Sequence, residues 1–139
     1  MVEGKAFIIT VELYFSFLES EFGMQVIEEK QRGNAFYDVR FAAKDKIVSV
    51  SYENIEDYLQ VIVFLLEMGR MPDYDDKTNT LHLSHLNGLV MSKVSKDEIS
   101  SNAKYFSKWN VKSELERKLL KGAKELRLCL KHLDQLKIA

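Results

Sequence analysis

The chain of 139 residues has few of the residues that build covalent or metal-held scaffolds. It has one cysteine, so no intrachain disulfide and no cysteine-rich zinc module can form. Its six glycines are scattered, and it contains no glycine-rich phosphate loop, no Gly-x-Ser-x-Gly elbow and no dinucleotide fingerprint. No apolar run approaches the roughly 18 residues of a membrane-spanning helix, and no signal-peptide cleavage site follows the apolar segment 6–18. We therefore expect a cytoplasmic protein without a membrane partner.

Charge is nearly balanced over the whole chain, with 20 basic and 21 acidic side chains. A net charge of −1 gives no reason to expect nucleic acid as a partner. The two signs are not evenly distributed, because eight basic and four acidic residues follow position 110, against 12 and 17 before it. A basic C-terminal segment and an acidic remainder can attract each other within one molecule or between two.

Hydrophobic periodicity predicts a helix over Val2–Phe22, ended by Gly23. Its apolar positions recur at steps of four and three: Phe7, Val11, Tyr14, Leu18 and Phe22. After a short mixed segment, apolar residues alternate with polar ones in two runs, 37–41 and 48–52, each preceded by a turn. This period of two predicts an antiparallel meander. The run 57–68 fits a strand or a helix, and its β-branched residues favour the strand.

Residues after 83 have helical patterns. We predict short helices over Ser84–Lys93 and Lys96–Lys108, the second with a capping box of Ser95 and Glu98, and a long helix over Val111–Leu136. The sequence thus predicts one α+β domain, residues 1–139, with an N-terminal helix, an antiparallel meander of three or four strands and C-terminal helices including one long helix. Residues 1–81 form the helix and sheet, and residues 82–139 a helical tail packed on them or on a partner.

The long helix carries a heptad seam, in which apolar residues recur at steps of four and three. Its main members are Leu115, Leu119, Leu126 and Leu133, with Gly122, Cys129 and Leu136 between or after them. Such a stripe is typical of a helix packed on its own domain, and it also fits a seam between two helices of a dimer. In a simple meander the apolar strand 61–66 lies at an edge, which favours pairing with a second copy. We therefore expect a homodimer, joined through that strand or through the last helix.

The polar loop before residue 80 concentrates three carboxylates and an aromatic residue: Asp73, Tyr74, Asp75 and Asp76. Counted from Asp73, a calcium loop requires glycine at its sixth position and glutamate at its twelfth, where this chain has Thr78 and Ser84. Most such loops are only solvated surface, and the functional alternative is a recognition patch for a basic partner protein.

His82 and His85 follow that loop and would share one face of a helix, with a carboxylate such as Asp75 to complete a metal site. Exposed or singly hydrogen-bonded histidines are the commoner outcome. Cys129 lies on the apolar seam, where a thiol normally behaves as a small hydrophobe and not as a nucleophile. We therefore assign no catalytic residue, no metal ligand and no cofactor.

Residues from about Phe15 to Leu83 resemble small bacterial immunity-type proteins of polymorphic toxin systems. The resemblance is carried by Ser51-Tyr52-Glu53, by the run 61–66, and by Gly69 with Pro72-Asp73-Tyr74. It implies a protein that occludes a partner without catalysis. The sequence thus favours a non-enzymatic protein-binding module. One alternative is a metal-binding or hydrolase-like protein that uses His82, His85 and nearby acids, and the other is a structural homodimeric scaffold.

Overall fold

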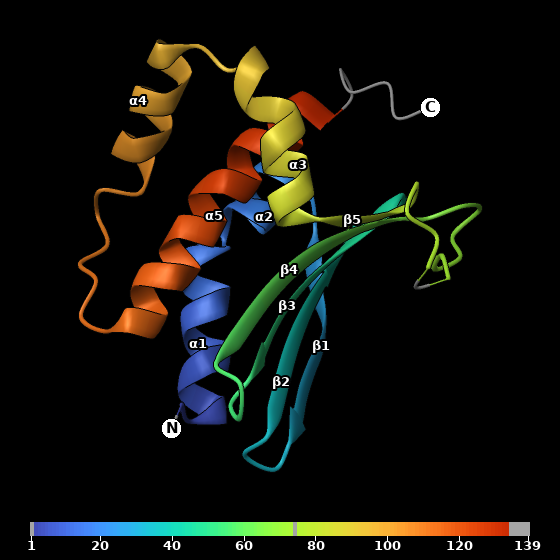
Figure 1. Ribbon diagram of the computed structural model, residues 1–139, viewed down its shortest axis with the longest axis vertical. Helices are drawn as coiled ribbons and strands as arrows, with labels where there is room; N and C mark the ends of the chain where they lie inside the picture. The colour runs from blue at the N-terminus through green and yellow to red at the C-terminus, as the bar shows by residue number, and fades with distance from the viewer. Residues whose placement is uncertain (1, 74, 134–139) are drawn as a thin grey trace. The chain divides into compact units, whose positions relative to one another are not determined.

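The computed structural model describes residues 2–73 and 75–133, and Figure 1 labels its helices and strands. The chain divides into two compact units, Met1–His82 and Leu83–Ala139. The sequence-based division lay between residues 81 and 82. The first unit contains two helices and a sheet, and the second contains helices. The predicted α+β class, with an N-terminal helix, an antiparallel sheet and C-terminal helices including a long one, is confirmed.

The first unit is an antiparallel meander of five strands with two helices before it. Its elements are α1 (Gly4–Tyr14), α2 (Phe17–Phe22), β1 (Gln25–Arg32), β2 (Phe36–Ala42), β3 (Lys46–Glu53), β4 (Tyr58–Leu65) and β5 (Thr80–His82). The strands lie in the order β1-β2-β3-β4-β5. Three or four strands were expected. The mixed segment after Gly23 forms β1, and the three residues of β5 are too few to show a period in the sequence.

Alternation along the strands separates an apolar face from a more polar one. On β2, Tyr37, Val39 and Phe41 are fully buried. The helix α1 packs against this strand, and the Phe7 ring lies 5.7 Å from the Tyr37 ring between centroids. Gly4 permits the close approach, because a Cβ there would lie 2.1 Å from the Gln31 side chain. The first unit therefore has its core between α1 and one face of the sheet.

The predicted single helix Val2–Phe22 is wrong in one respect, because it breaks between α1 and α2. The backbone tightens there, with Leu18 N–H donating to the Phe15 carbonyl oxygen at 3.0 Å, three residues back. Tyr14, Phe15, Phe17 and Leu18 are all buried, which is more of the circumference than one face of a straight helix provides. The break allows all four side chains to be buried. The predicted end at Gly23 is confirmed, with a left-handed φ of 66°.

The ambiguous run 57–68 forms a strand, as the sequence favoured, since β4 spans Tyr58–Leu65. Its position differs from the expectation of an edge strand, because β5 pairs with Ile62, Val63 and Phe64. Residues pointing to both faces of β4 are buried. This part of β4 is therefore not free to pair with a second copy of the sheet.

The second unit consists of α3 (Leu83–Val90), the short 3₁₀ helix η1 (Met91–Lys93), α4 (Lys96–Tyr105) and α5 (Glu114–His132). The capping box of Ser95 and Glu98 is confirmed, and the Ser113 side chain caps α5 by accepting from the Glu116 N–H. Both α3 and α4 pack against α5. Among the helices of the described part of the chain, none combines the length and apolar character needed to cross a membrane.

Candidate functional site

The connection from β4 to β5 starts with a tight two-residue turn. Glu67 and Arg70 exchange both backbone hydrogen bonds, at 3.1 and 2.9 Å, and enclose Met68 and Gly69. Both enclosed residues have positive φ, 54° and 77°, as in the hairpin turn that normally contains Asn-Gly. A left-handed conformation costs a residue such as methionine about 1–2 kcal/mol. The turn nevertheless presents Met68 to solvent, with 99% of its surface exposed.

A groove of about 350 Å³ lies beside this turn. It is lined by Glu67, Met68, Arg70, Met71, Pro72, Asp73 and Asp76. Three carboxylates and one guanidinium give the lining a net negative charge. Met71 is also exposed, so two flexible apolar side chains stand among the charged ones. The groove therefore offers apolar contact and negative charge at the same place.

Asn79 fixes two of the groove's carboxylates. Its side-chain amide donates to Asp76 Oδ2 at 2.9 Å and to Glu67 Oε1 at 3.0 Å. The backbone N–H groups of Thr78 and Asn79 also donate to Asp76, at 3.1 and 3.3 Å. These hydrogen bonds, the Asn79 amide first, hold the pKa of Asp76 below its ordinary value. Asp76 is therefore a charged residue that shapes the loop as well as lining the groove.

Only some of the four residues predicted as the partner-binding patch line the groove. Asp73 and Asp76 line the groove, whereas Asp75 is exposed outside the lining. Tyr74 lies outside the described residues. Among those residues, the Asp73 carboxylate has no hydrogen-bond or ion-pair partner, which leaves it available to a ligand. The sequence did not identify Glu67, Met68 or Met71, because Met-Gly is not one of the pairs, such as Asn-Gly or Asp-Gly, that signal a two-residue turn.

The two histidines of the alternative hypothesis lie on different elements. His82 ends β5, and its Nδ1 lies 3.2 Å from the Gln60 amide nitrogen on β4. His85 is exposed on α3. Within residues 2–73 and 75–133, no three histidine, cysteine, aspartate or glutamate side chains gather as a metal-binding group. The shared helical face on which the metal hypothesis depended is therefore not formed.

Cys129 is fully buried on α5. Burial raises the pKa of its thiol to about 12, and the negative charge of Glu125 acts in the same direction. A nucleophilic cysteine needs the opposite shift, towards the thiolate. The thiol therefore stays protonated at neutral pH and contributes packing.

The more polar face of the sheet carries a cluster that sequence analysis did not identify. Asp38 is buried, accepts a hydrogen bond from the Ser49 hydroxyl at 2.7 Å and pairs with Arg40 Nε at 3.0 Å. The Arg40 guanidinium also lies over the Phe64 ring, 5.7 Å from its centroid. Ser49 is also buried, so its hydroxyl is not presented to a substrate as the hydroxyl of a serine nucleophile must be. This cluster satisfies a buried carboxylate and links β2 to β3.

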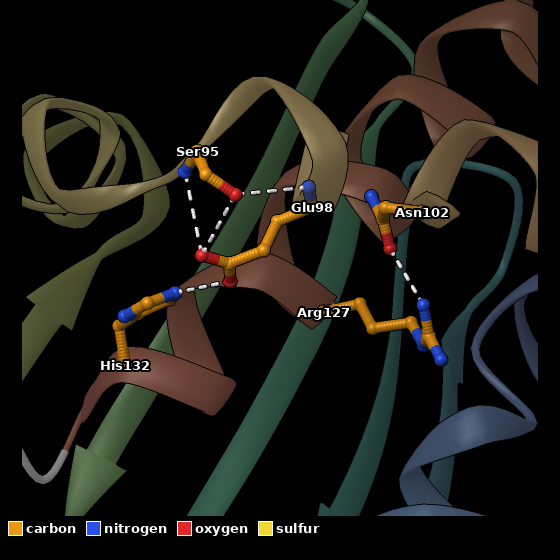
Figure 2. Close-up of polar contacts among 5 residues, drawn as sticks. All are labelled: Ser95, Glu98, Asn102, Arg127 and His132. Atoms are coloured by element: carbon orange, nitrogen blue, oxygen red, sulfur yellow. Dashed lines mark hydrogen bonds and ion pairs between the residues drawn. The ribbon is translucent and has the colours of Figure 1, made fainter. Parts of the chain in front are cut away.

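A second polar cluster joins α4 to α5 in the second unit (Figure 2). His132 Nε2 lies 2.7 Å from Glu98 Oε2, and Arg127 Nη1 donates to Asn102 Oδ1 at 2.9 Å. The hydrogen bond with His132, and next that with the Ser95 backbone N–H, lower the pKa of Glu98. Asn102 also donates to the Lys124 carbonyl oxygen at 3.0 Å. These contacts pair charged side chains with groups of the same unit and hold α4 against α5.

The predicted heptad seam is largely inaccessible in the single chain. Leu119, Leu126 and Leu133 are buried, and Leu115 is half-buried. A dimer through this seam would require α5 to leave its present packing.

Comparison of the chain with protein-family models, curated proteins and solved structures finds no match. We therefore infer a function from the geometry and charge of the described residues.

Proposed function

We propose that the chain is a non-enzymatic protein-binding module that binds a basic partner at the groove formed by the connection from β4 to β5. The observation that carries the proposal is the combination, on one exposed loop, of the fully exposed Met68 with the carboxylates of Glu67 and Asp73. Exposed apolar side chains surrounded by charge are typical of recognition surfaces.

The charges of the two units also favour a basic partner. Residues 1–82 contain 15 acidic and eight basic side chains, and residues 83–139 contain six and 12, so the units carry −7 and +6. The negative charge of the first unit attracts a cationic protein and speeds its diffusional encounter. In this proposal the chain acts as an immunity-type inhibitor, which occludes a basic functional surface of its partner.

The other functions receive less support from the described contacts. His82 and His85 do not share an element, and Cys129 is shielded from reaction. Zinc bound stoichiometrically and lost in His82→Ala would favour the metal-binding alternative. The homodimer stays a prediction, with the inner position of β4 and the burial of the seam as structural arguments against its two expected interfaces. A sedimentation mass of one chain would contradict it.

The proposal is tested by affinity capture followed by mass spectrometry and direct binding. The test variant combines Glu67→Gln, Asp73→Asn and Asp75→Asn, and leaves Asp76 to hold the loop. The matched control, Glu3→Gln with Glu53→Gln and Glu56→Gln, removes the same charge elsewhere in the first unit. We expect a basic protein that binds the wild type and the control, and that binds the test variant about tenfold or more weakly. Equal binding of the captured partner by all three proteins would contradict the proposal.

A further inference from the structure

We infer that the groove accepts a basic side chain, lysine or arginine, from an extended segment of the partner protein. This inference rests on the proposed function and names the chemistry that the groove recognises. The methionines Met68 and Met71 contact the aliphatic stem of the incoming side chain. The carboxylates of Asp73 and Glu67 pair with its charged end.

The size of the groove limits what it can hold. Its volume of about 350 Å³ is at the lower end of the roughly 300–1,000 Å³ found for small-molecule sites. It therefore suits one or two side chains, whereas a folded surface would contact only its rim. An extended segment can insert a side chain while its backbone stays outside.

The charges of the residues that line the groove favour a positively charged occupant. Glu67, Asp73 and Asp76 oppose the one cation, Arg70, and they lie in a unit that carries −7. Among these carboxylates, Asp73 has no partner within the described part of the chain. An ammonium or guanidinium group can form a charge-assisted hydrogen bond with it, whereas an acidic side chain would be repelled.

The apolar part of the lining matches the other half of a basic side chain. Lysine and arginine have stems of three or four methylene groups that pack on apolar surface while the charged end stays polar. Methionine is unbranched and adapts its shape to such partners. Met68 is 99% exposed, so its side chain is not part of the hydrophobic core, and Met71 is 41% exposed. Both are available to a ligand.

The direct test observes the methionine methyl groups by NMR in the full chain. The probes are three acetylated and amidated pentapeptides, Gly-Ala-X-Ala-Gly, in which X is lysine, arginine or the uncharged isostere norleucine. We expect the lysine or arginine peptide to shift the methyl signals of Met68 and Met71, with lysine and arginine compared directly. The buried Met24 and the exposed Met91 of the second unit are internal controls. Absence of a shift with both cationic peptides, an equal shift with norleucine, or an equal shift at Met91 would overturn the inference.

A substitution separates recognition from stability. Met68→Asn introduces the Asn-Gly pair that this turn prefers, so we expect its melting temperature to rise. The same change removes the apolar contact, so we expect the cationic peptide to bind about fivefold more weakly. Asp73→Asn should weaken binding without that stabilisation, and Glu56→Gln, at the other end of the β3–β4 hairpin, should leave it unchanged. Unaltered peptide binding by Met68→Asn and Asp73→Asn would contradict the inference.

The outcomes distinguish this inference from the proposed function. If partner capture depends on Glu67, Asp73 and Asp75 but no cationic peptide shifts the methionine signals, the basic side-chain model is wrong and the binding function stands. If the peptides shift those signals but partner capture is unaffected by the carboxylates, the groove binds cations and the proposed function is wrong.

Discussion

At the scale of single residues, most acidic and basic side chains with defined partners stabilise the chain's own elements. Asp38 is satisfied by Ser49 and Arg40, and Asp76 by Asn79. Glu12 differs, because its Oε2 atom is buried with no hydrogen-bond partner among the described residues. The interaction with the Glu29 carboxyl group, then burial, then the negative charges of Glu29 and Glu19, raise the pKa of Glu12 to about 7. Two carboxyl groups this close favour sharing a proton.

This pairing predicts a stability that falls as the pH rises. Glu12 has an ordinary pKa of 4.5, so between pH 4.5 and 7 the folded chain holds a proton that the unfolded chain has released. Stability therefore decreases through this window and stays lower above it. We expect Glu12→Gln, which stays uncharged and can donate to Glu29, to gain in melting temperature over the wild type between about pH 5 and pH 8.

Thermal unfolding followed by circular dichroism measures the difference. The exposed Glu56→Gln is the control, and its difference from the wild type should not grow over the same range. A melting-temperature difference between Glu12→Gln and the wild type that is independent of pH would contradict the assignment.

At the scale of elements, local signals predicted the type of most helices and strands, and packing decided their limits. The capping box of Ser95 and Glu98 identified the start of α4 because its hydrogen bonds are local. The break between α1 and α2 was not predicted, since it arises from burying residues on several sides of the chain. The strand β5 is defined by pairing with β4 and not by a pattern of its own.

The helix α4 provides a test of polar docking. Asn102 is the buried residue of this helix, and it bonds both to the Arg127 guanidinium and to the Lys124 carbonyl oxygen. Asn102→Ala leaves both groups without this partner, and a buried polar group that loses its bond costs about 1–3 kcal/mol. We therefore expect a loss of about 2–4 kcal/mol in the free energy of unfolding, measured with urea.

The neighbouring exposed residue supplies the control for that experiment. Ser101→Ala should change the stability by no more than about 0.5 kcal/mol, because Ser101 lies on the exposed side of α4. If both substitutions have equally small effects, the contacts of Asn102 do not stabilise the second unit.

At the scale of the whole molecule, the sequence predicted the α+β class and found part of the candidate site. The carboxylates of Asp73 and Asp76 were visible as an acidic run. The groove itself depends on the turn at Met68 and Gly69, which brings Glu67 and Met71 beside those carboxylates. The division of charge was also visible, and the structural boundary after His82 sharpens it to −7 and +6.

The sheet edge formed by β1 is not suited to pairing with the sheet of another molecule. The strand β1 has a register shift between Val26 and Glu28, and its residues 28–30 are all charged. Bulges and charges of this kind oppose pairing between sheet edges. The recognition that we propose for the loop after β4 does not require that edge.

If the chain binds a basic partner through the acidic groove, as we propose, the kinetics of association with the captured partner must depend on the groove's negative charge. The rate constant is measured over a range of salt concentrations for the wild type and for the variant Glu67→Gln, Asp73→Asn and Asp75→Asn. We predict that the variant associates about tenfold more slowly at low salt, and that its rate depends less on salt because long-range attraction has been reduced. Identical rate constants and salt dependence for the two proteins would show that the groove does not bind the partner.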